Sequence, residues 1–133
     1  MKRNILVATA LAGLFAIQPA HAQLTPEQLI DNAITQAKSA MDAASLPRVK
    51  VLLQRAANCL IGRDSGYFVI GAGGLCNSRI NLTTSITIKQ KRDMVTDAYN
   101  KLLAGSGQPD VQRAQDYAED AIALLEEAKE AED

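Results

Sequence analysis

The sequence has no tryptophan, and its only histidine is His21, close to the N-terminus. It has three tyrosines, two phenylalanines and just two cysteines, Cys59 and Cys76. Histidine is the commonest general base and a common metal ligand, so its near absence argues against acid–base catalysis and against a zinc site. Serine or cysteine nucleophiles would also lack their usual partner. We therefore expect a protein that is not an enzyme and that holds no metal or cofactor.

Long apolar runs are scarce as well, and the one at residues 5–17 is too short to span a bilayer comfortably. It follows Lys2 and Arg3 and precedes Ala20-His21-Ala22, which has small residues at the two positions that a signal peptidase reads. This pattern predicts a secretory signal peptide over residues 1–22, cleaved before Gln23, in a periplasmic or secreted bacterial protein. An uncleaved membrane anchor is the alternative.

Cleavage would leave residues 23–133 as a single helical domain with no transmembrane segment. In an oxidising compartment Cys59 and Cys76 are expected to form a disulfide. For a loop of about eighteen residues, the entropy estimate is roughly 3 kcal/mol, which is a large share of the stability of a small domain. Free catalytic thiols are the alternative, but the spacing is far from C-x-x-C and no histidine remains to activate them.

Apolar residues recur at helical spacing in four segments, and capping signals mark their ends. Thr25, Pro26 and Gln28 match an N-cap, a first helical position and a capping box, and this helix ends before Pro47. A second helix has Pro47 in its first turn and stops at Gly62. We expect a third helix over about residues 85–103.

A fourth helix is expected over about residues 109–131, with an apolar seam at alternating spacings of three and four. The seam is Val111, Ala114, Ala118, Ala121, Leu125 and Ala128. The first and second helices would form one helical hairpin, and the third and fourth a second one. Two helical hairpins predict an all-α fold, a small four-helix bundle. The alanine spacing resembles that of small periplasmic metal-binding bundles, in which histidines along the helices hold the metal. Residues 23–133 contain no histidine, so the resemblance implies an architecture and not that function.

Between the second and third helices lies a glycine-rich loop, closed by the predicted disulfide. It contains the only adjacent aromatic pair, Tyr67 and Phe68. Residues 67–70 and 80–84 are rich in β-branched or aromatic side chains and allow a short β-ribbon. We expect Phe68 and Ile70 to cap the open end of the bundle and Tyr67 to be the exposed contact residue.

Charge is divided sharply along the chain. Residues 48–92 carry eight basic residues against Asp64, whereas residues 93–133 carry eleven acidic residues against three basic ones. One interpretation is internal complementarity, with Lys50 and Arg55 of the second helix beside the acidic fourth helix. The other is a basic surface around the loop, made by Arg63, Arg79, Lys89, Lys91 and Arg92, that attracts an anionic partner. Nucleic acid is not expected, given the compartment and the net negative charge.

The sequence therefore predicts an exported binding protein that acts through protein–protein contacts, as an adaptor, inhibitor, immunity protein or chaperone-like factor. The protein itself would be a monomer or a homodimer. The predicted partner-binding residues are Arg63, Tyr67, Phe68, Arg79, Lys89 and Arg92. A carrier of a small apolar ligand or a divalent cation within the bundle is the alternative function.

Overall fold

The structure, a computed structural model, describes residues 23–131, and no strand occurs in that range. In chain order the elements are α2 (Pro26–Asp42), α3 (Leu46–Ile61), the short 3-10 helix η2 (Ile70–Ala72), α4 (Leu82–Ser85), α5 (Lys89–Ser106) and α6 (Val111–Glu130). The prediction of an all-α fold is confirmed. The predicted signal peptide over residues 1–22 lies outside the described residues. Within residues 23–131, none of the helices has the length and apolar character needed to cross a membrane.

Capping groups explain where the long helices begin and end. The Thr25 hydroxyl accepts a hydrogen bond from the Gln28 amide at 3.1 Å, and the Gln28 side chain accepts one from the Thr25 amide at 2.9 Å, as the capping box predicts. The second long helix, α3, ends at Gly62, whose φ of 81° favours glycine. Asp110 caps α6 by accepting a hydrogen bond from the Arg113 amide at 2.8 Å.

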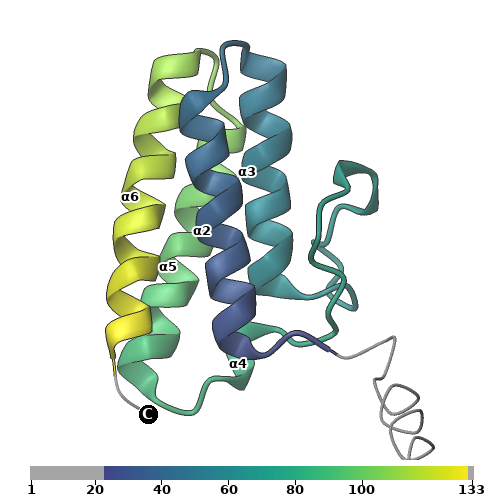
Figure 1. Ribbon diagram of the computed structural model, residues 1–133, viewed down its shortest axis with the longest axis vertical. Helices are drawn as coiled ribbons and strands as arrows, with labels where there is room; N and C mark the ends of the chain where they lie inside the picture. The colour runs from purple at the N-terminus through teal and green to yellow at the C-terminus, as the bar shows by residue number, and fades with distance from the viewer. Residues whose placement is uncertain (1–22, 132–133) are drawn as a thin grey trace, which may run out of the picture.

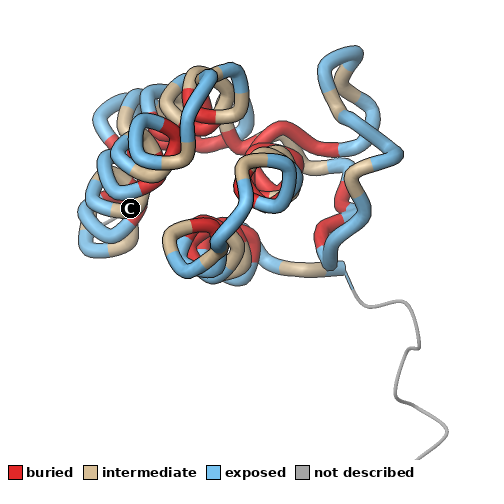
Figure 2. Tube along the Cα trace, turned by 90° about the horizontal axis from the view of Figure 1, so that it is seen from above, coloured by how far each residue is buried: buried red, intermediate tan, exposed pale blue. Residues whose placement is uncertain are grey.

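The four long helices, α2, α3, α5 and α6, lie side by side and are called the helical body below (Figure 1). The first of them, α2, packs against α3 and α6, and α5 packs against α6 and α3. Their buried residues face one another across the interior (Figure 2). Because α6 buries mostly alanine, its neighbours approach it closely. The buried residues of α6 are Ala114, Ala118, Ala121, Leu125 and Ala128.

One side chain of α6 ties the two hairpins together at the end of α2. The Gln115 Nε2 atom lies 3.1, 3.0 and 3.1 Å from the carbonyl oxygens of Ala40, Met41 and Ala43, respectively. The last carbonyl groups of a helix lack donors inside it, and here the two N–H groups of the Gln115 amide are shared among the three oxygens, of which that of Ala40 also accepts from the Ala43 amide. The contact joins residues more than seventy positions apart, and helical periodicity gives no sign of it.

The third long helix begins later than predicted. Its start was expected near residue 85, whereas α5 begins at Lys89 and is preceded by the single turn of α4. The Asn81 side chain caps α4, and residues 86–88 are all β-branched, which disfavours a continuous helix. Ile86 is extended, and its carbonyl oxygen accepts a hydrogen bond from Arg92 Nη1 at 2.9 Å. This bond holds the connection against the first turn of α5.

The predicted β-ribbon is wrong. Neither residues 67–70 nor residues 80–84 form a strand, and η2 and α4 take up part of each segment. The backbone of Val69 bonds instead to the side chain of Asn58 on α3. A side-chain amide thus supplies the donor and the acceptor that a neighbouring strand would have offered.

Gly105 lies at a tight contact between α5 and its neighbours. A Cβ added at Gly105 would lie 2.8 Å from Leu53 Cδ1 on α3, 3.0 Å from Tyr117 Cβ and 3.1 Å from the Ala114 carbonyl oxygen on α6. Those distances are shorter than ordinary contacts, so a methyl group requires the Leu53 side chain to shift and Tyr117 and the Ala114 backbone of α6 to give way. Gly107, just past the end of α5, has more room, since the nearest atom to an added Cβ would be 3.7 Å away.

We predict that Gly105→Ala lowers the free energy of unfolding by about 1–3 kcal/mol, because overpacking outweighs the gain in helix propensity. Urea unfolding followed by circular dichroism measures the change. Gly107→Ala is the matched control, and we expect it to stay within about 0.5 kcal/mol of the parent. Equal stability of the two variants would contradict the tight crossing at Gly105.

Tyr99 is a buried residue of α5 whose protonation state affects the free energy of unfolding. It is 8% exposed, and its hydroxyl has no hydrogen-bond partner within residues 23–131. Burial, with a further contribution from Tyr67, raises the pKa of Tyr99 above its ordinary value of 10.0. The folded state therefore holds the phenolic proton more tightly than the unfolded state does. Stability is fully present below pH 10 and is lost as the pH rises through the raised pKa.

We predict that the free energy of unfolding falls above about pH 10 more steeply in the parent protein than in Tyr99→Phe. At neutral pH the two should differ by less than about 1 kcal/mol, because the removed hydroxyl has no partner to lose. Denaturant unfolding between neutral and alkaline pH checks both expectations. Parallel pH profiles would show that Tyr99 does not couple its proton to folding.

Candidate functional site

Three residues on one face of α3 hold the glycine-rich segment that follows it. Arg55, Asn58 and Cys59 stand at positions i, i+3 and i+4, so their side chains point in the same direction. Each contacts a different point of residues 62–81, which we call the tethered loop. The loop runs beside the end of α3 and stands apart from the rest of the helical body (Figure 1). Its shape is therefore set by α3 rather than by regular structure of its own.

Asn58 is the central anchor of the tethered loop. Its side chain is 2% exposed, and its Nδ2 atom donates to the Val69 carbonyl oxygen at 2.9 Å. Its Oδ1 atom accepts from the Val69 amide at 3.1 Å and from Gln54 Nε2 at 3.3 Å. A buried amide with both ends bonded fixes the backbone of one residue in place. Val69 is thus held while its side chain faces outward.

Arg55 fixes the far side of the loop. Its Nε atom donates to the Ala72 carbonyl oxygen at 2.6 Å, its guanidinium group lies under Gly73 and its aliphatic stem runs under Gly74. Both glycines have positive φ, at 74° and 100°, and a Cβ on Gly74 would lie only 3.0 Å from Arg55 Cγ. Glycine is needed at Gly74 both for the turn and for the close approach of the arginine.

The disulfide closes the loop. Cys59 and Cys76 are bonded, with their Cα atoms 4.9 Å apart, and both are buried. This confirms the predicted pairing. Beside it the Arg63 amide donates to the Ser78 carbonyl oxygen at 2.7 Å, and a Cβ on Gly62 would lie 2.7 Å from the Ile80 carbonyl oxygen. The two ends of the loop therefore meet at the end of α3.

Large apolar side chains of the loop face solvent. Tyr67 is 76% exposed, Ile70 85% and Leu75 73%, and Val69 is also exposed. Tyr67 is thus exposed, and its role as a contact residue stays a prediction. The expectation that Ile70 caps the interior is wrong, because η2 turns its side chain away from the helices. Phe68 and Ile80 are the large apolar residues of the loop that are partly buried against the core.

A hollow of about 620 Å³ lies within the tethered loop, whose own residues line it. Its lining brings together three of the predicted binding residues, Arg63, Phe68 and Arg79. Arg79 Nε lies 3.8 Å from Asp64 Oδ2, and both side chains are well exposed, so the pair contributes little to stability. The exposed side chain of Arg63 makes no ion pair or hydrogen bond within residues 23–131. The hollow thus combines apolar lining with an available guanidinium group.

The other predicted basic residues do not join this hollow. Lys89 lies in the first turn of α5 and pairs with Asp93 at 2.7 Å. Lys91 is buried, and Arg92 is partly buried and bonds to the Ile86 carbonyl oxygen. The basic surface expected from the sequence is therefore divided. Its loop part, Arg63 and Arg79, stands apart from the α5 part.

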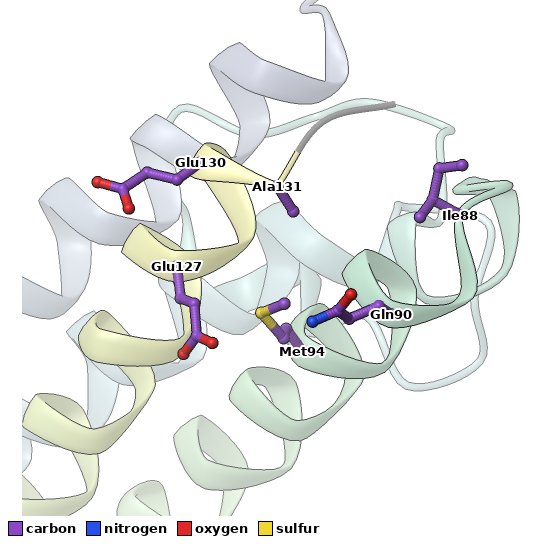
Figure 3. Close-up of a pocket in the computed structure, with 6 residues that line it drawn as sticks. All are labelled: Ile88, Gln90, Met94, Glu127, Glu130 and Ala131. Atoms are coloured by element: carbon purple, nitrogen blue, oxygen red, sulfur yellow. The ribbon is translucent and has the colours of Figure 1, made fainter.

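Lys89 and Asp93 instead line a groove between α5 and α6. The groove consists of two adjoining hollows of about 510 and 290 Å³ that share Gln90, Met94 and Glu127. Figure 3 shows Gln90 and Met94 on α5, with Glu127 and Glu130 on the neighbouring α6. We call this the acidic groove. Its lining is Ile88, Lys89, Gln90, Asp93, Met94, Asp97, Leu124, Glu127, Glu130 and Ala131.

The acidic face of α6 meets basic residues of α2 and α5, not of α3. Glu126 lies 3.7 Å from Lys38 of α2, and Asp120 lies 3.7 Å from Lys101 of α5. The expected pairing with Lys50 and Arg55 is wrong, because α3 lies diagonally across the helical body from α6. A further contact joins α6 to α2: the hydrogen bond from Lys129 of α6 to Asp31 of α2 raises the pKa of Lys129.

Within residues 23–131 no three acidic, histidine or cysteine side chains are grouped so as to hold a metal ion. Comparison with protein-family models, curated proteins and solved structures found no match to this chain. The function therefore rests on the geometry of the tethered loop.

Sequence reasoning missed the two polar anchors of the loop. Arg55 was assigned to an ion pair with α6, and Asn58 was not singled out. One signal was available: both occupy the helical face of Cys59, at spacings of four and one residues, and an asparagine amid the buried positions of a helix needs a partner.

We predict that Asn58→Ala lowers the free energy of unfolding by about 1–3 kcal/mol, because the amide and carbonyl of Val69 lose their buried partner. We also expect faster proteolysis within residues 62–75, measured by mass spectrometry of the fragments. Gln54→Ala is the matched control on the same helix, since it removes one bond to Asn58 and none to the loop. Unchanged proteolysis in Asn58→Ala would mean that the disulfide alone holds the loop.

Proposed function

We propose that this protein is an exported, non-enzymatic binding protein that engages another protein through the tethered loop. In this view it acts as an adaptor, inhibitor, immunity protein or chaperone-like factor. One observation carries the proposal. Tyr67, Ile70 and Leu75 are each more than 70% exposed, although the backbone between them is anchored at three points on α3.

Anchoring favours binding for a physical reason. A flexible loop loses conformational entropy when it docks, whereas an anchored loop has already lost most of that freedom on folding. Aromatic and large aliphatic side chains then supply contact area, and an arginine beside them supplies directional hydrogen bonds. Tyr67, Ile70 and Arg63 provide these groups within one short segment.

The helical body serves as the rigid support in this proposal, and we take it to be a four-helix bundle. Export is supported by the pattern of residues 1–22 and by a disulfide that persists in oxidising compartments. The alternative function, a carrier of a small apolar ligand or a divalent cation, has no comparable support. The hollows found lie at the surface, and they are lined in part by charged residues.

We predict that a photoreactive amino acid placed at Tyr67 or Ile70 crosslinks one protein reproducibly in the native cell. The same amino acid placed at Asn100, an exposed position in the middle of α5, should not capture that protein. Mass spectrometry identifies the crosslinked species. Equal capture from all three positions, or none from the loop, would contradict a binding role for the tethered loop.

A further inference from the structure

The molecule carries two surfaces that complement each other in charge and in apolar character. The loop surface consists of Tyr67, Val69, Ile70 and Leu75 together with Arg63 and Arg79. The acidic groove has an apolar part formed by Ile88, Met94 and Leu124, and its charged lining consists of Lys89 against Asp93, Asp97, Glu127 and Glu130. We propose that the loop surface of one copy docks in the acidic groove of a second copy.

The charges of the acidic groove are not balanced within residues 23–131. Lys89 is paired with Asp93, which leaves Asp97, Glu127 and Glu130. None of these three forms an ion pair within residues 23–131. Of the other acids of α6, Asp120 pairs with Lys101 and Glu126 with Lys38, whereas Asp116 and Glu119 form no ion pair within residues 23–131. Three unpaired carboxylates thus line this one groove.

The loop has the opposite imbalance. Arg63 has no partner within the described residues, and Arg79 has only a long contact with Asp64. Each surface therefore combines apolar side chains with an excess of charge of one sign, positive on the loop surface and negative in the acidic groove, where Met94 and Leu124 are partly buried. Charge complementarity of this kind speeds encounter, fixes the register of the partners and suppresses association of like surfaces. The match excludes loop-to-loop and groove-to-groove pairing, each of which places like charges together.

A chain does not satisfy its own groove. The anchors on α3 hold the loop beside that helix, and Figures 1 and 2 place α6 on the opposite side of the helical body. The complement of each surface must therefore come from another molecule. Contacts between two different patches are head-to-tail, and they build rings or open chains rather than a symmetric pair. This inference rests on the proposed function, since it names a second copy as the partner of the loop.

Sedimentation of the purified protein tests the association. We expect the mean mass to rise as the concentration increases from about 10 μM to 1 mM, the range in which small interfaces associate. About 0.5 M salt should reverse the rise, because screening weakens the charge pairing. A constant monomer mass would overturn the inference. It would leave the proposed function standing if Tyr67 crosslinks a different protein in the cell.

Two charge-reversal variants test the head-to-tail pairing. Arg63→Glu with Arg79→Glu makes the loop acidic, and Glu127→Lys with Glu130→Lys makes the groove basic. Each variant alone should remain monomeric, because both of its surfaces then carry the same sign. Mixing the two restores opposite signs at every contact, so the mixture should associate as the parent does. Circular dichroism melts confirm that each variant is folded.

The remaining outcomes show whether the loop surface binds a second copy of the chain or a membrane. If the parent associates but the mixture of variants does not, the pairing of loop and groove is wrong. If the parent stays monomeric and its loop binds vesicles of anionic phospholipid, and Tyr67→Ser with Ile70→Ser abolishes that binding, the occupant is a membrane and the inference fails. Crosslinks from Tyr67 to peptides of α5 or α6 of another copy would support the inference directly.

Discussion

The attachment of the tethered loop to one face of α3 is the constraint on which the rest of the molecule depends. A segment with five glycines has many accessible conformations, and fixing each backbone residue costs about 1–2 kcal/mol. The disulfide lowers that cost by closing the loop in the unfolded chain as well. Asn58 and Arg55 then select one conformation by satisfying backbone groups that lie outside regular structure.

The distribution of charge follows from which helices are neighbours. The acidic helix α6 lies between α2 and α5, and its side chains pair with Lys38 and Lys101 there. The basic residues of α3 and the loop lie across the helical body and find few acidic partners. The charge division along the sequence thus becomes a division between two sides of the molecule. Exposed pairs add little stability, so this arrangement matters more for association than for folding.

The local signals in the sequence were enough to predict the disulfide and the four long helices apart from the start of α5, but not η2 or α4. Thr25, Gln28 and Gly62 form capping hydrogen bonds with residues three or four positions away, so the sequence alone predicts their roles. Gln115 and Asn58 act on backbone groups brought to them by the fold, and no periodicity marks such partners. The prediction of a β-ribbon was wrong for the same reason. The β-propensity of residues 67–70 carries no information about the Asn58 side-chain amide, which the fold brings to Val69.

Exposure of the apolar loop residues is built into the fold. Monomeric proteins rarely leave large apolar side chains grouped on the surface, and a free loop would fold them back against the helices. Here the anchors forbid that movement: Val69 is fixed at its amide and carbonyl, and Arg55 occupies the space beneath Gly73 and Gly74. Of the large apolar loop residues, Phe68 and Ile80 are partly buried against the core. The same bonds that stabilise the loop therefore hold Tyr67, Ile70 and Leu75 in solvent, where only contact with another molecule can bury them.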